Sequence, residues 1–348
     1  FGSKLVEEQA HCMVPPTVNP AYDYEYFKTI SKLDEENERT LKSTIDVYRK
    51  LGAILPFDCT PFFENNVPRF GEICSFSASG GAVYVNSVLG ARTNREAAQS
   101  AMCAAITGVT PEYGLLLEQN RAGDVLIQVE ADVDSEYDYE LLGYITPKKM
   151  GQAYHCPVFN GLSKQTTSEQ LMDLGTQLNI HGIVPMVHVA GVTPEAADVH
   201  TAFLGRKDPP VVTITNEDLA QARAEISAGT GKADFCILGC PHLTINQVGS
   251  IAKMLDGQQL AGQLYIFTST STKELAQRMG YLDIIHKAGG EIVINSCVDQ
   301  PCWSHLYGMS GVTESPKCAY YTKRWNMTFT VKSIPACIQS VLKGEIVS

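Results

Sequence analysis

Three cysteines stand where short apolar runs of the chain end and a turn begins. Cys59 follows ILPFD, Cys240 follows CILG, and Cys297 follows VINS. In open α/β sheets, ligands bind outside the carboxyl ends of the strands. The recurrence therefore predicts that three thiols from distant segments converge on one crevice, with Pro61 and Pro241 stiffening two of the turns.

Three thiolates can hold a metal, and the two candidate metals differ in their ligand sets. Structural zinc sites usually take four N/S ligands at close spacing such as C-x₂-C, and no such pair occurs in this chain. Iron–sulfur clusters usually take four thiolates, so a cluster with three protein thiolates leaves one iron open. An open iron is a Lewis acid that makes hydroxide a better leaving group. The reaction class that this indicates is dehydration of a hydroxy acid.

The same cysteines have a plainer interpretation as packing residues. The chain has 11 cysteines and no secretory signal, so a reduced, cytoplasmic compartment is expected, in which most cysteines are small buried hydrophobes. A single cysteine that ends a buried strand is more often packed than ligating, and the ligand hypothesis depends on the threefold recurrence. Cys302 is the substitute ligand. His242 is interpreted as a ligand, a general acid or a structural residue.

A second polar group, Arg92-Thr93-Asn94-Arg95, is expected at a strand-to-helix turn, with a capping box formed by Thr93 and Glu96. Backbone N–H groups and the helix dipole favour an anion there, and two guanidinium groups can bind a carboxylate or phosphate. The alternative is a capped helix with solvated arginines. Ser315 and Lys317 add a hydroxyl and an ammonium near the C-terminus.

The elements expected to position these residues alternate between apolar strands and helices, which favours parallel sheets covered on both faces. An amphipathic helix carries Leu41, Ile45 and Tyr48 and ends at Gly52, and the acidic stretch 132–140 is interpreted as a solvated excursion near a boundary. The expected strands are 82–88, 125–131, 183–189, 235–240, 263–268 and 291–297, and the later helices are 168–179, 215–227, 244–255 and 272–280.

Composition bounds the function. The chain has 348 residues, enough for about two domains, and 44% of them are hydrophobic, as in a globular protein. Its net charge of −11 disfavours nucleic acid and anionic membranes as partners. No apolar run reaches the length of a membrane span. A small-molecule substrate is therefore expected.

The segment NSVLGARTNRE at 86–96, continuing to TPEYG at 110–114, resembles the signature of aconitase X, a divergent branch of the aconitase superfamily. Four further segments resemble the other landmarks of this family in the same order: CTPF at 59–62, GVTPEA at 191–196, LGCPH at 238–242 and SPK at 315–317. The resemblance extends from about residue 14 to the end of the chain.

The resemblance implies a fold and a cofactor. The fold class is α/β, with layered aconitase-like domains whose largely parallel sheets are flanked by helices. Domains are expected at 1–140, carrying the NSVLGARTNRE signature, and at 141–348, carrying the GCPH and SPK motifs. The family's cysteine landmarks fall on Cys59, Cys240 and Cys297, which implies an iron–sulfur cluster on these residues. A swivelling domain, fused or separate, completes the site in the family and is not expected within these residues, and further residues are expected upstream of Phe1.

The resemblance also implies a reaction. Family members dehydrate cis-3-hydroxy-L-proline or mevalonate 5-phosphate, and a non-catalytic partner subunit is the alternative from another class. Ala78-Ser79-Gly80-Gly81 replaces a Glu-Ser-Ser that many members carry, and Glu314 and Tyr320 replace Asn and His. An added carboxylate would suit an amino group better than a phosphate, so we expect cis-3-hydroxy-L-proline to be dehydrated to a pyrroline carboxylate.

The expected site residues divide by role. Ser79 and Lys317 are the catalytic candidates, and a serine acting as a base needs a neighbouring cation. The substrate-binding candidates are Arg92, Thr93, Asn94, Arg95, Ser315 and Lys317.

Overall fold

The computed structural model describes residues 1–347, and the chain divides into two compact units. Unit 1 comprises residues 1–11, 17–60 and the chain from Ile226 onward, and unit 2 comprises residues 12–16 and 61–225. Residues 140 and 141, between which the sequence placed a domain boundary, both lie in the α6 helix (Glu136–Met150) of unit 2. Within residues 1–347, no helix has the length and apolar character needed to cross a membrane.

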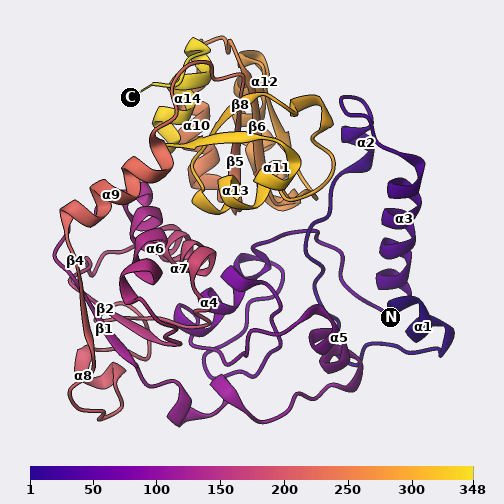
Figure 1. The fold of residues 1–348 in the computed structure, drawn as a ribbon. Coiled ribbons are helices and arrows are strands. Elements are labelled where there is room, and N and C mark those ends of the chain that lie inside the picture. The colour runs from indigo at the N-terminus through magenta and orange to yellow at the C-terminus, as the bar shows by residue number, and fades with distance from the viewer. Residues whose placement is uncertain (348) are drawn as a thin grey trace. The chain divides into compact units, whose positions relative to one another are not determined.

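Unit 1 is built around a parallel sheet in the order β7-β6-β5-β8-β9 (Figure 1). Its strands are β5 (Phe235–Leu243), β6 (Gln263–Thr268), β7 (Gly290–Val293), β8 (Ser310–Thr313) and β9 (Thr328–Val331). Its helices are α1 (Gly2–Glu7), α2 (Tyr24–Phe27), α3 (Glu35–Lys50), α10 (Ile245–Leu255), α11 (Thr270–Arg278), α12 (Tyr281–Ala288), α13 (Pro316–Tyr321) and α14 (Ile334–Lys343), with 3₁₀ turns at Ser304–Leu306 and Thr322–Trp325.

Both faces of this sheet are covered, and alternate residues of β5 face opposite sides. Cys236 and Leu238 pack into a core that includes residues of α10, α12 and α14. Phe235 and Ile237 face the other core, which contains the fully buried Trp303 and residues of α2 and α3. Burial on both sides explains why β5 reads as a continuous apolar run instead of an alternating one.

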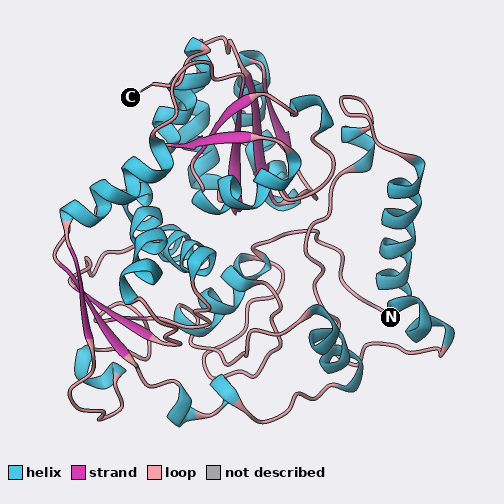
Figure 2. Ribbon diagram, viewed as in Figure 1, coloured by secondary structure: helices cyan, strands magenta, loops and turns pink. Residues whose placement is uncertain are grey.

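Unit 2 holds a second parallel sheet, in the order β3-β2-β1-β4. Its strands are β1 (Val125–Val129), β2 (Pro157–Asn160), β3 (His188–Val189) and β4 (Val211–Ile214). Its helices are α4 (Ser79–Ser87), α5 (Ala98–Thr107), α6 (Glu136–Met150), α7 (Ser168–His181) and α8 (Val199–Ala202), with 3₁₀ turns at Pro61–Phe63, Gly114–Leu116 and Glu118–Asn120. Residues 61–124 of this unit are mostly loop and short helix (Figure 2), and α9 (Asn216–Ser227) crosses the boundary into unit 1.

The α/β class with parallel sheets flanked by helices is confirmed, but two predicted elements are wrong. The segment 82–88 is not a strand, because residues 82–87 belong to α4 and Val88 is its C-cap. Every α4 residue from Gly81 to Ser87 is buried, and a short apolar run gives the same pattern in a buried helix as in a buried strand. The stretch 132–140 is not a solvated excursion, because Ser135 caps the start of α6 and Tyr139 and Glu140 are buried.

The predicted capping box at Thr93 is also wrong. The helix α5 begins at Ala98, and the Ser100 hydroxyl accepts the Ala97 N–H at 3.0 Å. Arg92 and Arg95 instead form parallel bridges to Ile73 and Phe76. The segment is thus extended backbone and not a strand-to-helix turn.

Candidate metal centre

The three predicted cysteines all belong to unit 1 and come from three different segments. Cys240 lies in β5 just beyond Leu238, where the pairing with β6 shifts register. Cys297 follows β7. Cys59 was expected at the end of a strand, but only an isolated bridge between Ile54 and Thr17 precedes it. The segment before Cys59 therefore takes its position from loop contacts, described below, and not from a sheet.

Gly239 fits the sharp path of the chain into Cys240. Its φ is +109°, and a Cβ there would lie 2.3 Å from the Phe267 carbonyl oxygen. Only glycine combines this backbone conformation with so close an approach to the neighbouring strand. The following Cys240–Pro241 peptide bond is cis.

Exposure separates these three cysteines from the others of unit 1. Cys59, Cys240 and Cys297 are partly exposed, whereas the remaining cysteines of this unit are buried. The buried set is Cys236, Cys302, Cys318 and Cys337. The packing interpretation predicts burial, and it therefore accounts for the four buried cysteines. It does not explain why Cys59, Cys240 and Cys297 are partly exposed.

Electrostatics places the three thiols near one another. Burial raises the pKa of Cys240, the Lys317 ammonium acts against this, and the negative charges of Cys297 and Cys59 raise the pKa further. Burial likewise raises the pKa of Cys297, an Asp299 N–H hydrogen bond opposes the rise, and Cys59 adds to it. Each sulfur therefore lies within electrostatic reach of the other two. Burial and neighbouring thiols oppose the charged forms of Cys240 and Cys297, and a bound cation would offset both effects.

The donor set fits an iron–sulfur cluster. The three sulfurs are free thiols, and two of them accept backbone N–H groups: Cys59 from His242 at 3.1 Å and Cys297 from Asp299 at 3.5 Å. Hydrogen bonds of this kind stabilise thiolate ligands and tune a bound cluster.

Asp58, Cys59 and His242 form a second group whose ligand atoms lie within 4.8 Å of one another. Both ring nitrogens of His242 are already engaged, Nδ1 with Asp58 Oδ1 and Nε2 with the Ser296 carbonyl oxygen, each at 2.9 Å. The imidazole has no lone pair left for a metal. The interpretation of His242 as a ligand is therefore wrong for this conformation.

The charges of this pair follow from its contacts. Burial by itself lowers the pKa of His242, but Cys59 and Asp58 outweigh it, and the pKa lies well above its usual value. Burial by itself raises the pKa of Asp58, but hydrogen bonds from His242 and Thr60 outweigh it and lower the pKa. Both side chains are almost fully buried, so these neighbouring groups and not water set the two pKa directions.

Glu314 has a different role from the one its sequence context suggested. It is buried, and its Oε1 accepts the N–H groups of Gly239 at 2.7 Å and Cys240 at 3.2 Å. Its Oε2 accepts the Thr313 hydroxyl at 3.2 Å. The carboxyl group is thus committed to the backbone that carries Cys240 and is not available to pair with an amino group of a substrate.

We expect Glu314→Leu to destabilise the protein by about 1–3 kcal/mol, because two buried N–H groups lose their acceptor. Glu314→Gln keeps an oxygen acceptor and should stay much closer to the wild type. Urea denaturation followed by far-UV circular dichroism measures both. Equal stability of Glu314→Leu and wild type would show that the contact contributes nothing.

The other predicted residues of unit 1 lie on α13. Ser315 is fully buried and caps this helix, accepting the Cys318 N–H at 3.2 Å. Lys317 is partly exposed, and its charge reaches Cys240. The SPK motif therefore places one ammonium beside the cysteines, while the serine hydroxyl serves the helix.

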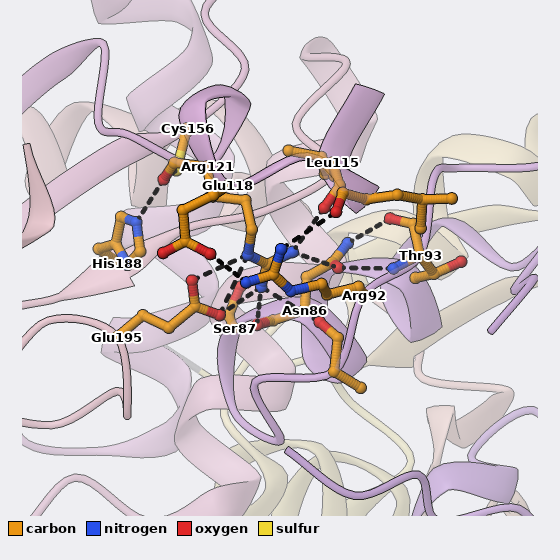
Figure 3. Close-up of polar contacts among 12 residues, drawn as sticks. Asn86, Ser87, Arg92, Thr93, Leu115, Glu118, Arg121, Cys156, His188 and Glu195 are labelled. Atoms are coloured by element: carbon orange, nitrogen blue, oxygen red, sulfur yellow. Dashed lines mark hydrogen bonds and ion pairs between the residues drawn. The ribbon is translucent and has the colours of Figure 1, made fainter. Parts of the chain in front are cut away.

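In unit 2, the Asn86 side chain braces the predicted anion-binding segment (Figure 3). Its Oδ1 accepts the Thr93 N–H at 3.0 Å, and its Nδ2 donates to the Thr93 carbonyl at 2.8 Å. Arg121 is fully buried, donates to Asn86 Oδ1 at 3.1 Å and pairs with Glu195. The signature segment is thus held by buried polar contacts within its own unit.

The four residues of this segment differ in what their side chains do. Thr93 and Asn94 are buried and bond to backbone: Thr93 Oγ1 accepts the Phe76 N–H at 2.9 Å, and Asn94 Oδ1 accepts the Leu115 N–H at 2.9 Å. Arg92 pairs with the Glu118 carboxylate, and Arg95 is exposed and donates to Asn179 Oδ1 at 2.9 Å. Only the arginines present groups that a ligand could reach.

Ser79, the remaining predicted residue, is the first residue of α4 and is partly buried. It belongs to unit 2. Its catalytic role stays a prediction.

The sequence analysis did not identify Asp58, whose carboxylate contacts His242 and so links the Cys59 and Cys240 segments. Only its position directly before Cys59 could have drawn attention to it. Cys318 lies within electrostatic reach of Cys240 and Cys297, and nothing in its sequence context distinguished it from a core cysteine.

Comparison with known proteins places the chain in a family. Models of the first, second and third domains of aconitase X match residues 1–119, 123–224 and 233–343. The "phosphomevalonate dehydratase large subunit" of Thermococcus kodakarensis is 34% identical over 97% of this chain and 84% of that protein. The protein of the same name from Methanothermobacter thermautotrophicus is 35% identical over 88% of this chain and 75% of its own length.

Another relative is named for a different substrate, and this chain covers a smaller share of its length. The "cis-3-hydroxy-L-proline dehydratase" of Pseudomonas aeruginosa is 33% identical over 73% of this chain and 45% of that protein. Among solved structures, Thermococcus kodakaraensis aconitase X (holo-form) superposes with a TM-score of 0.86 at 31% identity, covering 98% of this chain and 84% of that one. These relatives are named as dehydratases, so the alternative of a non-catalytic subunit is set aside. The chain belongs to the aconitase X family of hydro-lyases.

Proposed function

We propose that this chain dehydrates a small hydroxy acid with an iron–sulfur cluster held by Cys59, Cys240 and Cys297. The observation that carries the proposal is the meeting of these three partly exposed thiols from separate segments of unit 1. A cluster bound by three thiolates supplies a Lewis acid that helps hydroxide to leave.

The chain's own residues supply charge and position. The Lys317 ammonium lies within electrostatic reach of Cys240 and suits the carboxylate of a substrate. In unit 2, Arg95 is a better carboxylate-binding candidate than Arg92, because Glu118 already neutralises Arg92. Thr93, Asn94 and Ser315 shape the backbone that presents these cations. Ser79 remains a catalytic candidate, and the group that removes the proton α to the carboxylate is not assigned.

We propose cis-3-hydroxy-L-proline as the substrate, giving a pyrroline carboxylate. This amino acid is a zwitterion without net charge, whereas mevalonate 5-phosphate carries both a carboxylate and a phosphate. The Glu118 carboxylate on Arg92 reduces the positive charge available for a phosphate in unit 2. The loss of a carboxylate and a hydroxyl at Ala78–Gly81, relative to many members, also favours a changed substrate.

Mevalonate 5-phosphate is the second candidate, and the comparisons favour it. The two Thermococcus and Methanothermobacter relatives carry that activity in their names and match this chain over most of their own length. Their name "large subunit" also supports a proposal that a smaller subunit or domain completes the site of this chain.

An assay with both substrates tests the proposal. Anaerobically reconstituted protein is incubated with each compound, alone and together with a candidate small subunit, and the loss of one water is followed by mass spectrometry. We expect turnover of cis-3-hydroxy-L-proline to exceed that of mevalonate 5-phosphate. The reverse order would establish the second candidate. Iron and acid-labile sulfide are counted on the same sample, and their absence from active protein would exclude the cluster.

A further inference from the structure

The His242 side chain lies at the meeting point of the three cysteine segments. Its Nδ1 contacts Asp58 Oδ1 and its Nε2 contacts the Ser296 carbonyl oxygen, each at 2.9 Å. Asp58 directly precedes Cys59, Ser296 directly precedes Cys297, and His242 itself follows Cys240 by two residues. One imidazole therefore connects all three segments, which are far apart in the sequence.

The backbone of His242 adds a fourth contact, from its N–H to Cys59 Sγ at 3.1 Å. Both partners of the ring are themselves fixed. Asp58 Oδ1 also accepts the N–H and hydroxyl of Thr60, at 2.9 and 3.0 Å, and the Ser296 hydroxyl accepts the Asp23 N–H at 2.9 Å. The ring is thus held between two anchored groups and not between mobile ones.

Both ring contacts are hydrogen bonds in the protein interior. A carbonyl oxygen only accepts, so Nε2 carries a proton toward Ser296, and Nδ1 lies at hydrogen-bond distance from a carboxyl oxygen of Asp58. With His242 only 2% exposed and Asp58 only 1% exposed, water cannot easily replace either contact.

We propose that His242 is a positioning residue that sets the separation of the three thiols before any metal arrives. The role of the thiols as ligands rests on the proposed function, but the positioning itself does not. Groups that orient ligands in this way typically contribute about 10–100-fold to metal affinity. His242 would then act through the cysteines, without touching the substrate.

Substitutions at His242 and Asp58 test separately the two hydrogen bonds of the imidazole ring, one to Asp58 and one to Ser296. Asn in place of His242 can reach Asp58, Gln can reach Ser296, and neither can span both. Asp58→Asn keeps an oxygen for Nδ1 but removes the charge. His188→Asn is the matched control, because His188 is also 2% exposed and contacts a backbone carbonyl, that of Arg121, at 2.8 Å in unit 2.

The primary measurement uses the full chain freed of metal by a chelator under a reductant. Iodoacetamide alkylation of individual cysteines is timed by peptide mass spectrometry. We expect iodoacetamide to alkylate Cys59, Cys240 and Cys297 several-fold faster in the His242→Asn and His242→Gln variants than in wild type. The rates in His188→Asn should match those of wild type. Cys103, which is exposed, should react equally in all variants. Wild-type rates at all three cysteines in folded His242 variants would overturn the proposal.

Iron retention provides a second readout. After reconstitution, we expect the His242 variants to lose iron to a chelator about 10–100-fold faster than wild type, with Asp58→Asn in between. Faster alkylation in a protein that never binds iron would leave the positioning role intact and reject the proposed cluster. Unchanged alkylation in a protein that does bind iron would reject the positioning role alone.

Discussion

Replacing Cys59, Cys240 or Cys297 with serine, one at a time, is expected to abolish both the visible absorption of the reconstituted protein and its dehydratase activity. Serine is nearly the same size as cysteine, but its hydroxyl stays protonated at neutral pH and does not hold iron as a thiolate does. Because the chain offers three such thiols, the loss of one leaves too few protein ligands. Absorption spectra, iron content and turnover measure the effect on each variant.

One control comes from the same unit as these cysteines and the other from unit 2. Cys337→Ser changes a buried cysteine of the core behind β5 and should keep the absorption band, whatever it costs in stability. Cys103→Ser changes an exposed cysteine and should leave both properties unchanged. If one of the three predicted ligands can be replaced with full colour and turnover, that residue is not a ligand. Cys318 would then be examined next, because it lies within electrostatic reach of Cys240 and Cys297.

Arg121→Met is expected to destabilise unit 2 by about 2–4 kcal/mol, because several buried acceptors lose their donor and the partly exposed Glu195 carboxylate loses its partner. Arg121 is 1% exposed and its Nε donates to both carboxylate oxygens of Glu195, at 3.1 and 2.8 Å. It also donates to the carbonyl oxygens of Leu115 and Ala91, at 3.0 and 3.1 Å. One side chain thus satisfies acceptors from several loops (Figure 3).

Far-UV circular dichroism in urea measures this effect, since both tryptophans, Trp303 and Trp325, lie in unit 1 and their fluorescence would not report on unit 2. Arg121→Lys should rescue little, because an ammonium lacks the planar fork that reaches several acceptors. The control is Arg278→Met, which breaks an exposed pair with Glu274 on α11 and should cost about 0–1 kcal/mol. A cost for Arg121→Met as small as that of the control would show that the Arg121 contacts do not support unit 2.

Several strands and helices could be predicted because their patterns are local. The predicted strand 263–268 coincides with β6, and the predicted helices 244–255 and 168–179 agree closely with α10 and α7. In each helix a threonine cap and a glutamine three positions into the helix form a capping box that the sequence displays directly. The strands β2, β4, β8 and β9 are four residues long each and gave too short a pattern to detect.

Of the candidate site, the sequence pointed to the three cysteines and to Lys317, whose charge reaches Cys240. The role of Glu314 could not be read from the chain, because the sequence does not show whether a carboxylate faces a substrate or a backbone turn. The same holds for Arg92, whose partner Glu118 lies on a different loop. Both depend on contacts between segments that are distant in sequence.

The sequence by itself indicated the family and its hydro-lyase class, because the NSVLGARTNRE segment is a property of residue type and order and needs no coordinates. The cysteines that follow apolar runs were visible in the same way as candidate ligands. Only the tertiary structure decided which polar side chains hold those cysteines and which are free to bind. The hydrogen bonds of His242 to Asp58 and Ser296 join residues that are far apart in the sequence and that only the fold brings together. The order of residues in the chain does not show that these side chains are close in space.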